Sequence, residues 1–488
     1  MTSWAGQQIT VAGLGVSGIS AARALAGLGA TVTVVDGADS DTHRTKAAAL
    51  EADGIGVRLG DAHTLPKGTD LVVTSPGWPP SSPLFAAAAE AGVDVVGDVE
   101  IAWRLRGPAA APWLAITGTN GKTTTTQMLA SILAAAGLRT LAVGNIGTPI
   151  IDVVLEDKAV REARSVEGGG GRREGEPYDV LAVELSSYQL HWAPSLRAHS
   201  AAVLNLAPDH LDWHGSMEAY AADKGRIYAG NQVACVYNVA DPATEDLVRE
   251  ADVEEGCRAI GFTLGTPGPS ELGVVDGILV DRAFVADRQK QAQELAEVTD
   301  VNPPAPHNIA NALAAAALAR AYGVEPAAVR DGLRNFRPDA HRIEHVADVA
   351  GVAYVDDSKA TNTHAAEASL AAYESIVWIA GGLAKGATFD ELVRKSAKRL
   401  RGAVLIGADR ALIREALARH APEVPVVDLD RTDTGAMSAA VQEAARLAGP
   451  GDTVLMAPAC ASMDMFVNYN KRGEAFAQAV SELGSASA

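Results

Sequence analysis

One short stretch, Thr117–Thr126, constrains this chain more than any other part of it. The stretch reads TGTNGKTTTT and separates an apolar run from a segment with helical character. Gly118 and Gly121 let the backbone turn so that several N–H groups face phosphate oxygens. Lys122 adds a positive charge, and the Thr123 hydroxyl can ligate Mg²⁺ at a helix N-terminus. The sequence therefore predicts a strand, a phosphate-binding loop and a helix that together hold ATP.

The loop departs from the usual phosphate-loop spacing, which places another glycine where this chain has Ile116. A turn rich in Gly and Thr that binds nothing is the alternative. That alternative gives no reason for Gly-Lys-Thr at a strand-to-helix junction, so we favour a nucleotide site. The loop residues expected to contact ATP are Gly118, Thr119, Asn120, Gly121, Lys122, Thr123 and Thr124.

Length and composition are those of a soluble globular protein. The chain has 488 residues, of which 48% are hydrophobic and 21% charged, and this length suggests about three domains. No apolar run approaches the ~18 residues of a membrane span, and the first residues lack the pattern of a secretory signal, so we expect a cytoplasmic protein. Cys235, Cys257 and Cys460 are few and widely spaced, which indicates reduced thiols.

The formal net charge of −19 argues against a nucleic-acid partner, because most of the surface would repel phosphates. An anionic ligand must therefore meet local positive charge. We expect a monomer that acts on small molecules and does not insert into a membrane.

Apolar runs that alternate with Ala-rich helical stretches predict an α/β fold in three domains. We expect an N-terminal Rossmann-like domain over residues 1–109, a central P-loop ATPase-like domain over 110–337 and a C-terminal Rossmann-like parallel sheet over 338–488. Residues 156–177 are charged and Gly-rich, so we interpret them as a flexible insert in the central domain. The strands expected in the two outer domains are 8–12, 31–36, 71–75, 93–96, 353–356, 376–380, 403–406, 424–427 and 453–457.

A second glycine-rich loop, Gly13–Gly18, follows the first expected strand. It reads GLGVSG, opens a helix and has Asp36 at the end of the next strand, which matches the dinucleotide-binding fingerprint. Such a loop offers N–H groups to any diphosphate, so NAD and a UDP-sugar are both allowed, and a purely structural turn is a third reading. The turn Ser75-Pro-Gly77 ends a further strand and predicts a ligand crevice beside this loop.

Several downstream segments make the chain recognisable. With the phosphate loop, they closely resemble the Mur ligase family, the ATP-dependent amide ligases of cell-wall precursor synthesis, over nearly the whole chain. The third domain is most similar to the family member that adds D-glutamate to UDP-N-acetylmuramoyl-L-alanine. The segments that carry the resemblance are Asn145–Gly147, Glu184–Gln189, Asp209–Asp212, Ala222–Tyr228, Asp357–Asn362, Gly381–Lys385 and Pro458–Asp464, with Phe466.

The resemblance implies that ATP phosphorylates a substrate carboxylate and that an amine then displaces phosphate. Two unit charges ~4 Å apart repel by about 4 kcal/mol at an effective dielectric of 20, so cations must bring the two anions together. By resemblance, Thr123 and Glu184 hold one Mg²⁺ and His210 helps to hold a second. Lys224, as a carbamate, would also bind the second metal; an ordinary surface lysine is the alternative.

The resemblance also distributes roles among the other motif residues. Asn308 and Asn311 lie one helical turn apart and can address adenine together, although helix capping by Asn308 competes with this interpretation. Arg342 is expected to reach an ATP phosphate only if the third domain closes over the second. The remaining assignments are catalytic Lys122, His210, Lys224 and Lys359; ATP-binding Asp357; UDP-substrate Leu14, Gly15, Val16, Ser17, Asp36, Ser75, Asn145 and His210; and D-glutamate Thr361, Lys385, Ser462 and Met463.

Three other functions are weighed against this one. A dehydrogenase would use the first glycine loop but leave the phosphate loop without a role. A non-catalytic ATP-binding switch gives no reason for Glu184, His210 and Lys224 together. A sister Mur ligase with another amino acid is the close alternative, although the Asp-Asn-Pro-Arg motif typical of meso-diaminopimelate ligases is not in the sequence.

Overall fold

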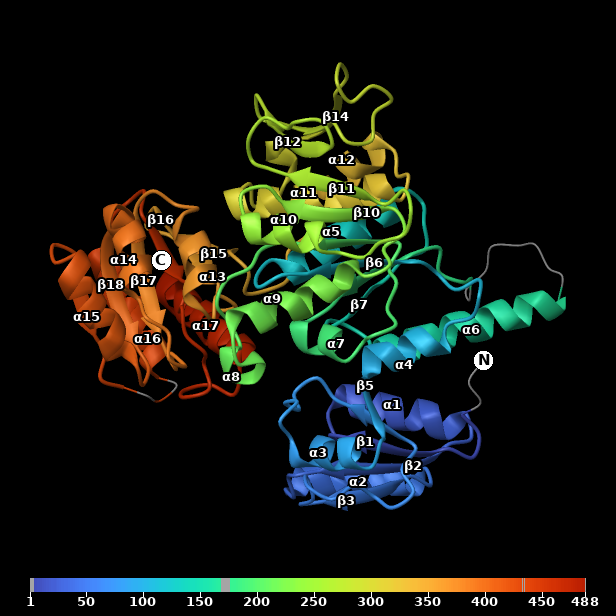
Figure 1. Cartoon of the computed structure of the whole chain (residues 1–488). Helices are drawn as coiled ribbons and strands as arrows, with labels where there is room; N and C mark the ends of the chain where they lie inside the picture. The colour runs from blue at the N-terminus through green and yellow to red at the C-terminus, as the bar shows by residue number, and fades with distance from the viewer. Residues whose placement is uncertain (1–3, 168–175, 432, 434, 488) are drawn as a thin grey trace. The chain divides into compact units, whose positions relative to one another are not determined.

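A computed structural model describes residues 4–167, 176–431, 433 and 435–487. Among these residues the chain forms three sheets, each dominated by parallel strands (Figure 1). The chain divides into two compact units, which are described separately. Unit 1 consists of Met1–Val301 and Asn308–Phe336, and unit 2 consists of Asn302–His307 and Arg337–Ala488.

The first sheet of unit 1 has the order β3-β2-β1-β4-β5, and its strands are all parallel. Alternate residues of β1 point to opposite faces, so Ile9 and Val11 enter one apolar core while Ala12 enters another. Burial on both faces explains the nearly continuous apolar strands. The elements are β1 Gln8–Ala12, α1 Val16–Gly27, β2 Thr31–Asp36, α2 Asp41–Ala52, β3 Gly56–Leu59, β4 Leu71–Thr74, α3 Pro83–Glu90, β5 Asp94–Gly97 and α4 Asp98–Leu105.

The second sheet of unit 1 has the order β14-β13-β12-β11-β10-β9-β6-β8-β7. Its strands are parallel from β7 to β12, and β12, β13 and β14 then form an antiparallel meander. Its strands are β6 Trp113–Thr117, β7 Ala142–Gly144, β8 Leu181–Glu184, β9 Ser200–Val203, β10 Ala234–Asn238, β11 Arg258–Phe262, β12 Glu271–Val275, β13 Ile278–Asp281 and β14 Gln293–Glu297. Its helices are α5 Lys122–Ala135, α6 Ile150–Glu167, α7 Ser187–His191, α8 Leu211–His214, α9 Met217–Gly225, α10 Pro242–Arg249, α11 Pro306–Ala321 and α12 Pro326–Asn335.

Small residues let the helices around the second sheet approach closely. The Ala-rich α11 is buried along most of its length, and α12 packs directly on α5. A Cβ atom at Gly332 would lie 2.3 Å from the Cα atom of Ile132, so only glycine allows this approach. The packing of α5 matters for function because its first residue is Lys122.

Unit 2 contains the sheet β15-β16-β20-β17-β18-β19, in which only β15 runs antiparallel to its neighbour among the described strands. Two apolar clusters cover the two faces of this sheet. The strands are β15 Glu344–Val349, β16 Val352–Asp356, β17 Ile376–Gly381, β18 Leu400–Ile406, β19 Val426–Asp428 and β20 Thr453–Met456. The helices are α13 Thr363–Leu370, α14 Asp390–Ser396, α15 Arg410–His420, α16 Ala436–Leu447 and α17 Tyr469–Ser487.

The expected α/β class and all nine strands expected in the two outer domains are confirmed, with ends that shift by a few residues. The expected insert over residues 156–177 is wrong in its first part. Residues up to Glu167 belong to α6, where buried Asp157 accepts hydrogen bonds from Arg161 Nε at 2.7 Å and from the Tyr178 N–H at 2.8 Å. These bonds stabilise the buried Asp157 carboxylate, whereas the composition of the segment predicts that its charged residues are not buried. Residues 168–175 lie outside the described residues.

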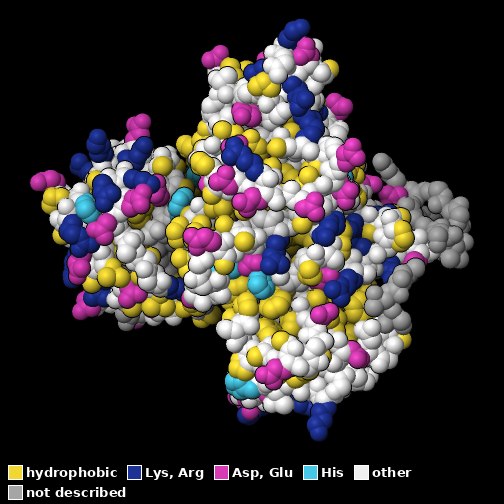
Figure 2. Space-filling view, in the orientation of Figure 1, with side chains coloured by type: hydrophobic (Ala, Val, Ile, Leu, Met, Phe, Trp, Pro, Cys, Tyr) yellow, Lys and Arg dark blue, Asp and Glu magenta, His cyan; other side chains and the backbone are white. Residues whose placement is uncertain are grey.

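Charged side chains of both signs alternate over the face drawn in Figure 2, so the net negative charge is not gathered into one patch there. Within the described residues, every helix is too short or too polar to cross a membrane.

Candidate active site

The phosphate loop lies between β6 and α5, as the sequence predicts. Gly121 is the N-cap of α5 and has a φ of 82°, in the left-handed region that favours glycine. A Cβ atom there would also lie 2.4 Å from Asn311 Oδ1, so the buried side chain of Asn311 packs against the loop. The ATP-binding prediction for Asn311 is thus consistent with its position, while its role stays a prediction.

Two lysine amines converge on one carbonyl oxygen of the loop. Lys122 Nζ donates to the Gly118 oxygen at 2.9 Å and to the Thr119 oxygen at 2.9 Å. Lys224 Nζ donates to the same Gly118 oxygen at 2.8 Å. A site with this concentration of amines is suited to an anion.

Lys224 is only 1% exposed, so it is not the surface lysine of the alternative interpretation. Burial, followed by repulsion from Lys122, lowers the pKa of Lys224 well below the ordinary value of a lysine. A lowered pKa raises the share of the uncharged amine, and only the uncharged amine can react with carbon dioxide to give a carbamate. The environment of Lys224 therefore suits the predicted modification.

Glu184 ends β8, next to β6 in the sheet, and is 1% exposed. Its Oε1 atom accepts a hydrogen bond from Asn145 Nδ2 at 2.9 Å. Within the part of the chain that the structure describes, its Oε2 atom has no hydrogen-bond partner. A buried carboxylate oxygen left without a donor fits a cation ligand, so Glu184 fits the predicted Mg²⁺ site, while the part of Thr123 in that site stays a prediction.

His210 also borders the loop, in a left-handed conformation with a φ of 54°. The ring centroids of His210 and Tyr188 are 4.9 Å apart. Burial lowers the pKa of His210, opposed by Asp209 and reinforced by Lys122 and Lys224. A neutral imidazole is the form that binds metal ions.

A cavity of about 140 Å³ brings many of these side chains together. Lys122, His210 and Lys224 are predicted catalytic residues, and all three line it. Asn145, predicted to contact the UDP-substrate, lines it as well. The lining residues without a predicted role are Ser186, Ser187, Tyr188, Asp209 and Tyr220.

Asp223, which sequence reasoning missed, ties together the helices around this cavity. Its carboxylate lies 2.9 Å from His191 Nδ1 on α7 and 2.9 Å from His214 Nδ1 on α8. Arg226 Nε lies 3.0 Å from the same carboxylate. Burial alone would raise the pKa of Asp223, but the bonds from the two histidines outweigh it and hold the pKa at about 2. The Asp223 carboxylate therefore links the three short helices α7, α8 and α9.

The first glycine loop is supported by Asp36. The two carboxylate oxygens accept the Leu14 N–H at 2.7 Å and the Ala38 N–H at 2.9 Å. A Cβ atom at Gly13 would lie 2.8 Å from Ser75 Oγ, and this Oγ is buried with no hydrogen-bond partner among the described residues. The first glycine loop and the Ser75 turn therefore pack against each other, while the crevice expected there and the roles of Leu14, Gly15, Val16, Ser17, Asp36 and Ser75 toward a UDP-substrate stay predictions.

In unit 2, the residues predicted to bind D-glutamate lie on three loops that follow β16, β17 and β20. Leu383 and Ala461 exchange two backbone hydrogen bonds of 2.9 Å, which joins the loop of Lys385 to that of Ser462 and Met463. The Ala459 N–H donates to the Ala360 oxygen at 2.9 Å, which adds the loop of Lys359 and Thr361. The carboxyl ends of parallel strands form ligand crevices in open α/β sheets.

Arg472 is a second residue that sequence reasoning missed. It is 2% exposed and donates to the Ser358 and Cys460 oxygens at 2.8 and 3.0 Å, which fixes two of these loops to α17. Next to Ser358, the buried Asp357 has its pKa raised to about 6 by desolvation, against a hydrogen bond from Ser369. No local sequence signal marks Arg472, because its partners lie 12 and 114 residues away.

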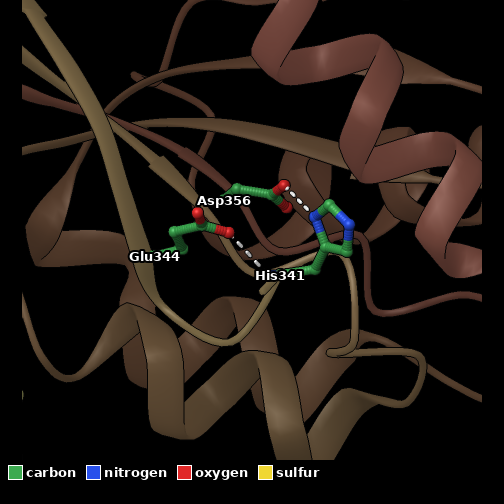
Figure 3. A group of neighbouring side chains, drawn as sticks. All are labelled: His341, Glu344 and Asp356. Atoms are coloured by element: carbon green, nitrogen blue, oxygen red, sulfur yellow. Dashed lines mark hydrogen bonds and ion pairs between the residues drawn. The ribbon is translucent and has the colours of Figure 1, made fainter. Parts of the chain in front are cut away.

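His341, Glu344 and Asp356 form a cluster beside Arg342 (Figure 3). His341 Nδ1 bonds to Asp356 Oδ2 at 2.6 Å, and the His341 N–H donates to Glu344 Oε2 at 2.8 Å. The residues on both sides of Arg342 have a positive φ, 66° for His341 and 50° for Ile343. Such conformations persist only where surrounding contacts enforce them. The cluster thus holds a strained turn that carries Arg342.

Comparison with known proteins decides the family. The chain is 79% identical over 485 residues to the UDP-N-acetylmuramoylalanine--D-glutamate ligase of Streptomyces avermitilis, an alignment that covers 99% of this chain and 100% of that protein. The chain belongs to the Mur ligase family. Three family descriptions match in turn: the Mur ligase MurD-like N-terminal domain over residues 7–97, the Mur ligase middle domain over 116–319 and the Mur ligase glutamate ligase domain over 341–460.

Other Mur ligases agree with this assignment. The protein of the same name from Thermobifida fusca is 59% identical over 478 residues and aligns with 98% of this chain and 99% of its own length. Among solved structures, the MurC ligase of Thermotoga maritima has a TM-score of 0.55 at 16% identity, with 98% of this chain and 99% of that chain covered. The MurF ligase of Acinetobacter baumannii has a TM-score of 0.56 at 17% identity, with 93% and 90% covered. At these identities the likeness shows the fold alone.

The cluster around His341 leads to a prediction about unit 2. The hydrogen bond to Asp356 is the main cause that raises the pKa of His341. Asp356→Asn should lower this pKa toward 6.5, which an NMR titration of the imidazole can measure. A raised pKa stabilises the fold below the unfolded-state pKa, and this contribution disappears as the pH rises through the folded-state pKa. The variant should therefore lose about 1 kcal/mol of unfolding free energy at pH 5.5 and less at pH 8.5.

Asp348→Asn is the matched control for Asp356→Asn. Asp348 lies 3.2 Å from His345 on the same strand, but both side chains are exposed, so its loss should leave the stability almost unchanged. An Asp356→Asn protein with equal stability losses at both pH values would contradict the proposed ion pair.

Proposed function

We propose that this protein is an ATP-dependent amide ligase that adds D-glutamate to UDP-N-acetylmuramoyl-L-alanine in cytoplasmic peptidoglycan precursor synthesis. The observation that carries the chemistry is the cavity lined by Lys122, His210 and Lys224, at the carboxyl ends of β6 and β8. The identity of the two substrates is supported by the name of the relatives, which match over the whole chain.

The geometry accounts for the main electrostatic difficulty of the reaction. ATP and the acceptor carboxylate are both anions, and they must come within bonding distance. Lys122 and the N–H groups of the loop would offset the charge of the phosphates, and the burial of the site around Lys224 would strengthen each of these interactions. The carboxylate oxygen attacks the γ-phosphorus and ADP leaves; the amine of D-glutamate then attacks the acyl carbon, and phosphate leaves with the transferred oxygen.

Mg²⁺, when bound, would neutralise charge that develops on the phosphoryl oxygens. Thr123 and Glu184 would hold one ion, and His210 with carbamylated Lys224 would hold a second. The neutral state favoured for His210 and the lowered pKa of Lys224 support this assignment. Without the carbamate, a lysine in this position would repel the ion that it is proposed to bind.

The other substrate groups are assigned to the remaining predicted residues. The first glycine loop would take the UDP moiety, together with the buried Ser75 hydroxyl, which has no hydrogen-bond partner in the part of the chain that the structure describes. The loops of unit 2 would take D-glutamate, with Lys385 on its side-chain carboxylate and Thr361 and Ser462 as hydroxyl donors. We also propose that the protein is a monomer. Arg342 and Asp357 are proposed to contact ATP, and Lys359 is proposed as a catalytic residue.

Lys224→Ala tests the carbamate. Loss of a negative metal ligand should lower the rate of phosphate release by roughly two orders of magnitude or more. Acetate or formate should restore part of this rate, because a short carboxylate can occupy the position of the missing carbamate. Lys290→Ala alters a lysine of the same unit whose side chain is 82% exposed. This variant should release phosphate at the rate of the unaltered protein, and acetate or formate should not change that rate. A correctly folded Lys224→Ala protein that no carboxylate activates would argue against the modification.

Phosphate release from ATP with UDP-N-acetylmuramoyl-L-alanine tests the function itself. The assay would compare D-glutamate with L-glutamate, L-lysine, meso-diaminopimelate and no amino acid. We expect phosphate release only with D-glutamate. Release with a different amino acid would keep the family and overturn the substrate assignment. An absence of phosphate release with every amino acid would contradict the proposed ligase activity.

A further inference from the structure

A chain of hydrogen bonds leads from the wall of the cavity into the protein. Ser187, which lines the cavity, has its Oγ atom 2.9 Å from His214 Nε2. The other ring nitrogen of His214 lies 2.9 Å from Asp223 Oδ2. His191 and Arg226 complete the surroundings of Asp223. None of these residues has a role in the function proposed above, although the chain ends in the same cavity.

The hydrogen-bonding partners of His214 determine how its ring is oriented. The Asp223 carboxylate that faces Nδ1 also lies 3.0 Å from Arg226 Nε. The side chain of His214 is completely buried, so its ring nitrogens must find their partners within the protein. Because a carboxylate oxygen accepts hydrogen bonds, Nδ1 is the donor to Asp223, and Nε2 faces the Ser187 hydroxyl.

The position of the Ser187 hydroxyl follows from this contact. A hydroxyl has one hydrogen and two lone pairs, so its single bond with His214 Nε2 leaves at least one lone pair of Oγ for another partner. The ring of His214 cannot turn away, because it stacks on Tyr188 with a centroid distance of 5.5 Å and meets the edge of Tyr220 at 5.1 Å. Ser187 is thus held at the cavity wall, where its Oγ atom can accept a further hydrogen bond.

We propose that Asp223, acting through His214, positions Ser187 to accept a hydrogen bond from a water molecule of a hydrated Mg²⁺ ion in the cavity. Mg²⁺ keeps several of its waters in proteins, and a metal-bound water is a strong donor that needs an acceptor. Glu184, whose Oε2 atom has no hydrogen-bond partner among the described residues, lies on the same β8–α7 segment as Ser187. The inference rests on the proposed function, since that function brings Mg²⁺ into this cavity.

The test measures metal binding as well as activity. Electron paramagnetic resonance can follow Mn²⁺ binding to the full-length protein loaded with ADP, and phosphate release can be followed against Mg²⁺ concentration. Loss of an outer-shell partner weakens metal affinity by roughly 10- to 100-fold, so Ser187→Ala should weaken Mn²⁺ binding by about 10-fold. The Mg²⁺ concentration for half-maximal activity should rise by a similar factor.

His214→Asn separates positioning from general structure. The asparagine amide can replace Nδ1 as the donor to Asp223 but leaves nothing in the place of Nε2. It should weaken Mn²⁺ binding as Ser187→Ala does, and the double variant should be no weaker than Ser187→Ala alone, because both changes remove one interaction. Effects that add in the double variant would overturn the proposed action through Ser187.

Ser200→Ala is the matched control. Ser200 Oγ lies 3.1 Å from His199 Nδ1, so this substitution, like Ser187→Ala, removes a buried serine that bonds to a histidine. Ser200 lies on β9 and does not line the cavity. The variant should bind Mn²⁺ like the unaltered protein, and thermal unfolding of each variant verifies its fold.

Two results would overturn the inference while leaving the ligase activity in place. One is unchanged Mn²⁺ binding by a folded Ser187→Ala protein that still turns over. The other is covalent labelling of Ser187 by a fluorophosphonate, because hydrolases use the same three residue types to make serine a nucleophile. Absence of turnover in the unaltered protein would instead contradict the proposed function.

Discussion

The candidate site depends on two lysine amines that share one carbonyl oxygen. Lys122 and Lys224 both donate to the Gly118 oxygen, at 2.9 and 2.8 Å. Burial, and after it repulsion between the two like charges, lowers the pKa of Lys224. Bound phosphate would relieve the repulsion at Lys122, and conversion to a carbamate would reverse the charge at Lys224. The site is thus prepared for the anions of a carboxylate-activating reaction.

Elements from distant parts of the chain hold the two amines in place. Lys122 opens α5, whose approach to α12 requires Gly332, and Lys224 lies on α9 next to Asp223. The carboxylate of Asp223 joins α9 to α7 and α8, which carry Ser187 and His214. The same short helices therefore set the position of Lys224 and the position of Ser187 at the cavity wall. A buried charge shared by three helices specifies their arrangement more strictly than apolar packing can.

Sequence patterns predict the parts of this molecule that depend on local order. Gly121 and Lys122 signal the phosphate loop, and apolar runs locate the outer strands, since both signals lie within a few neighbouring residues. The contact between Ser187 and His214 spans 27 residues and has no periodic signal. The charged start of the expected insert is helical, because Asp157 finds partners in Arg161 and Tyr178. Buried polar contacts of this kind depend on the tertiary fold and cannot be read from composition.

The transfer of oxygen from substrate to phosphate tests most directly that this cavity activates a carboxylate. UDP-N-acetylmuramoyl-L-alanine labelled with ¹⁸O in its carboxylate would be turned over with ATP and D-glutamate, and the released phosphate analysed by mass spectrometry. An acyl phosphate requires that each phosphate carry one labelled oxygen, because the bond that breaks is between the acyl carbon and that oxygen. Unlabelled phosphate, formed together with the amide product, would contradict the account.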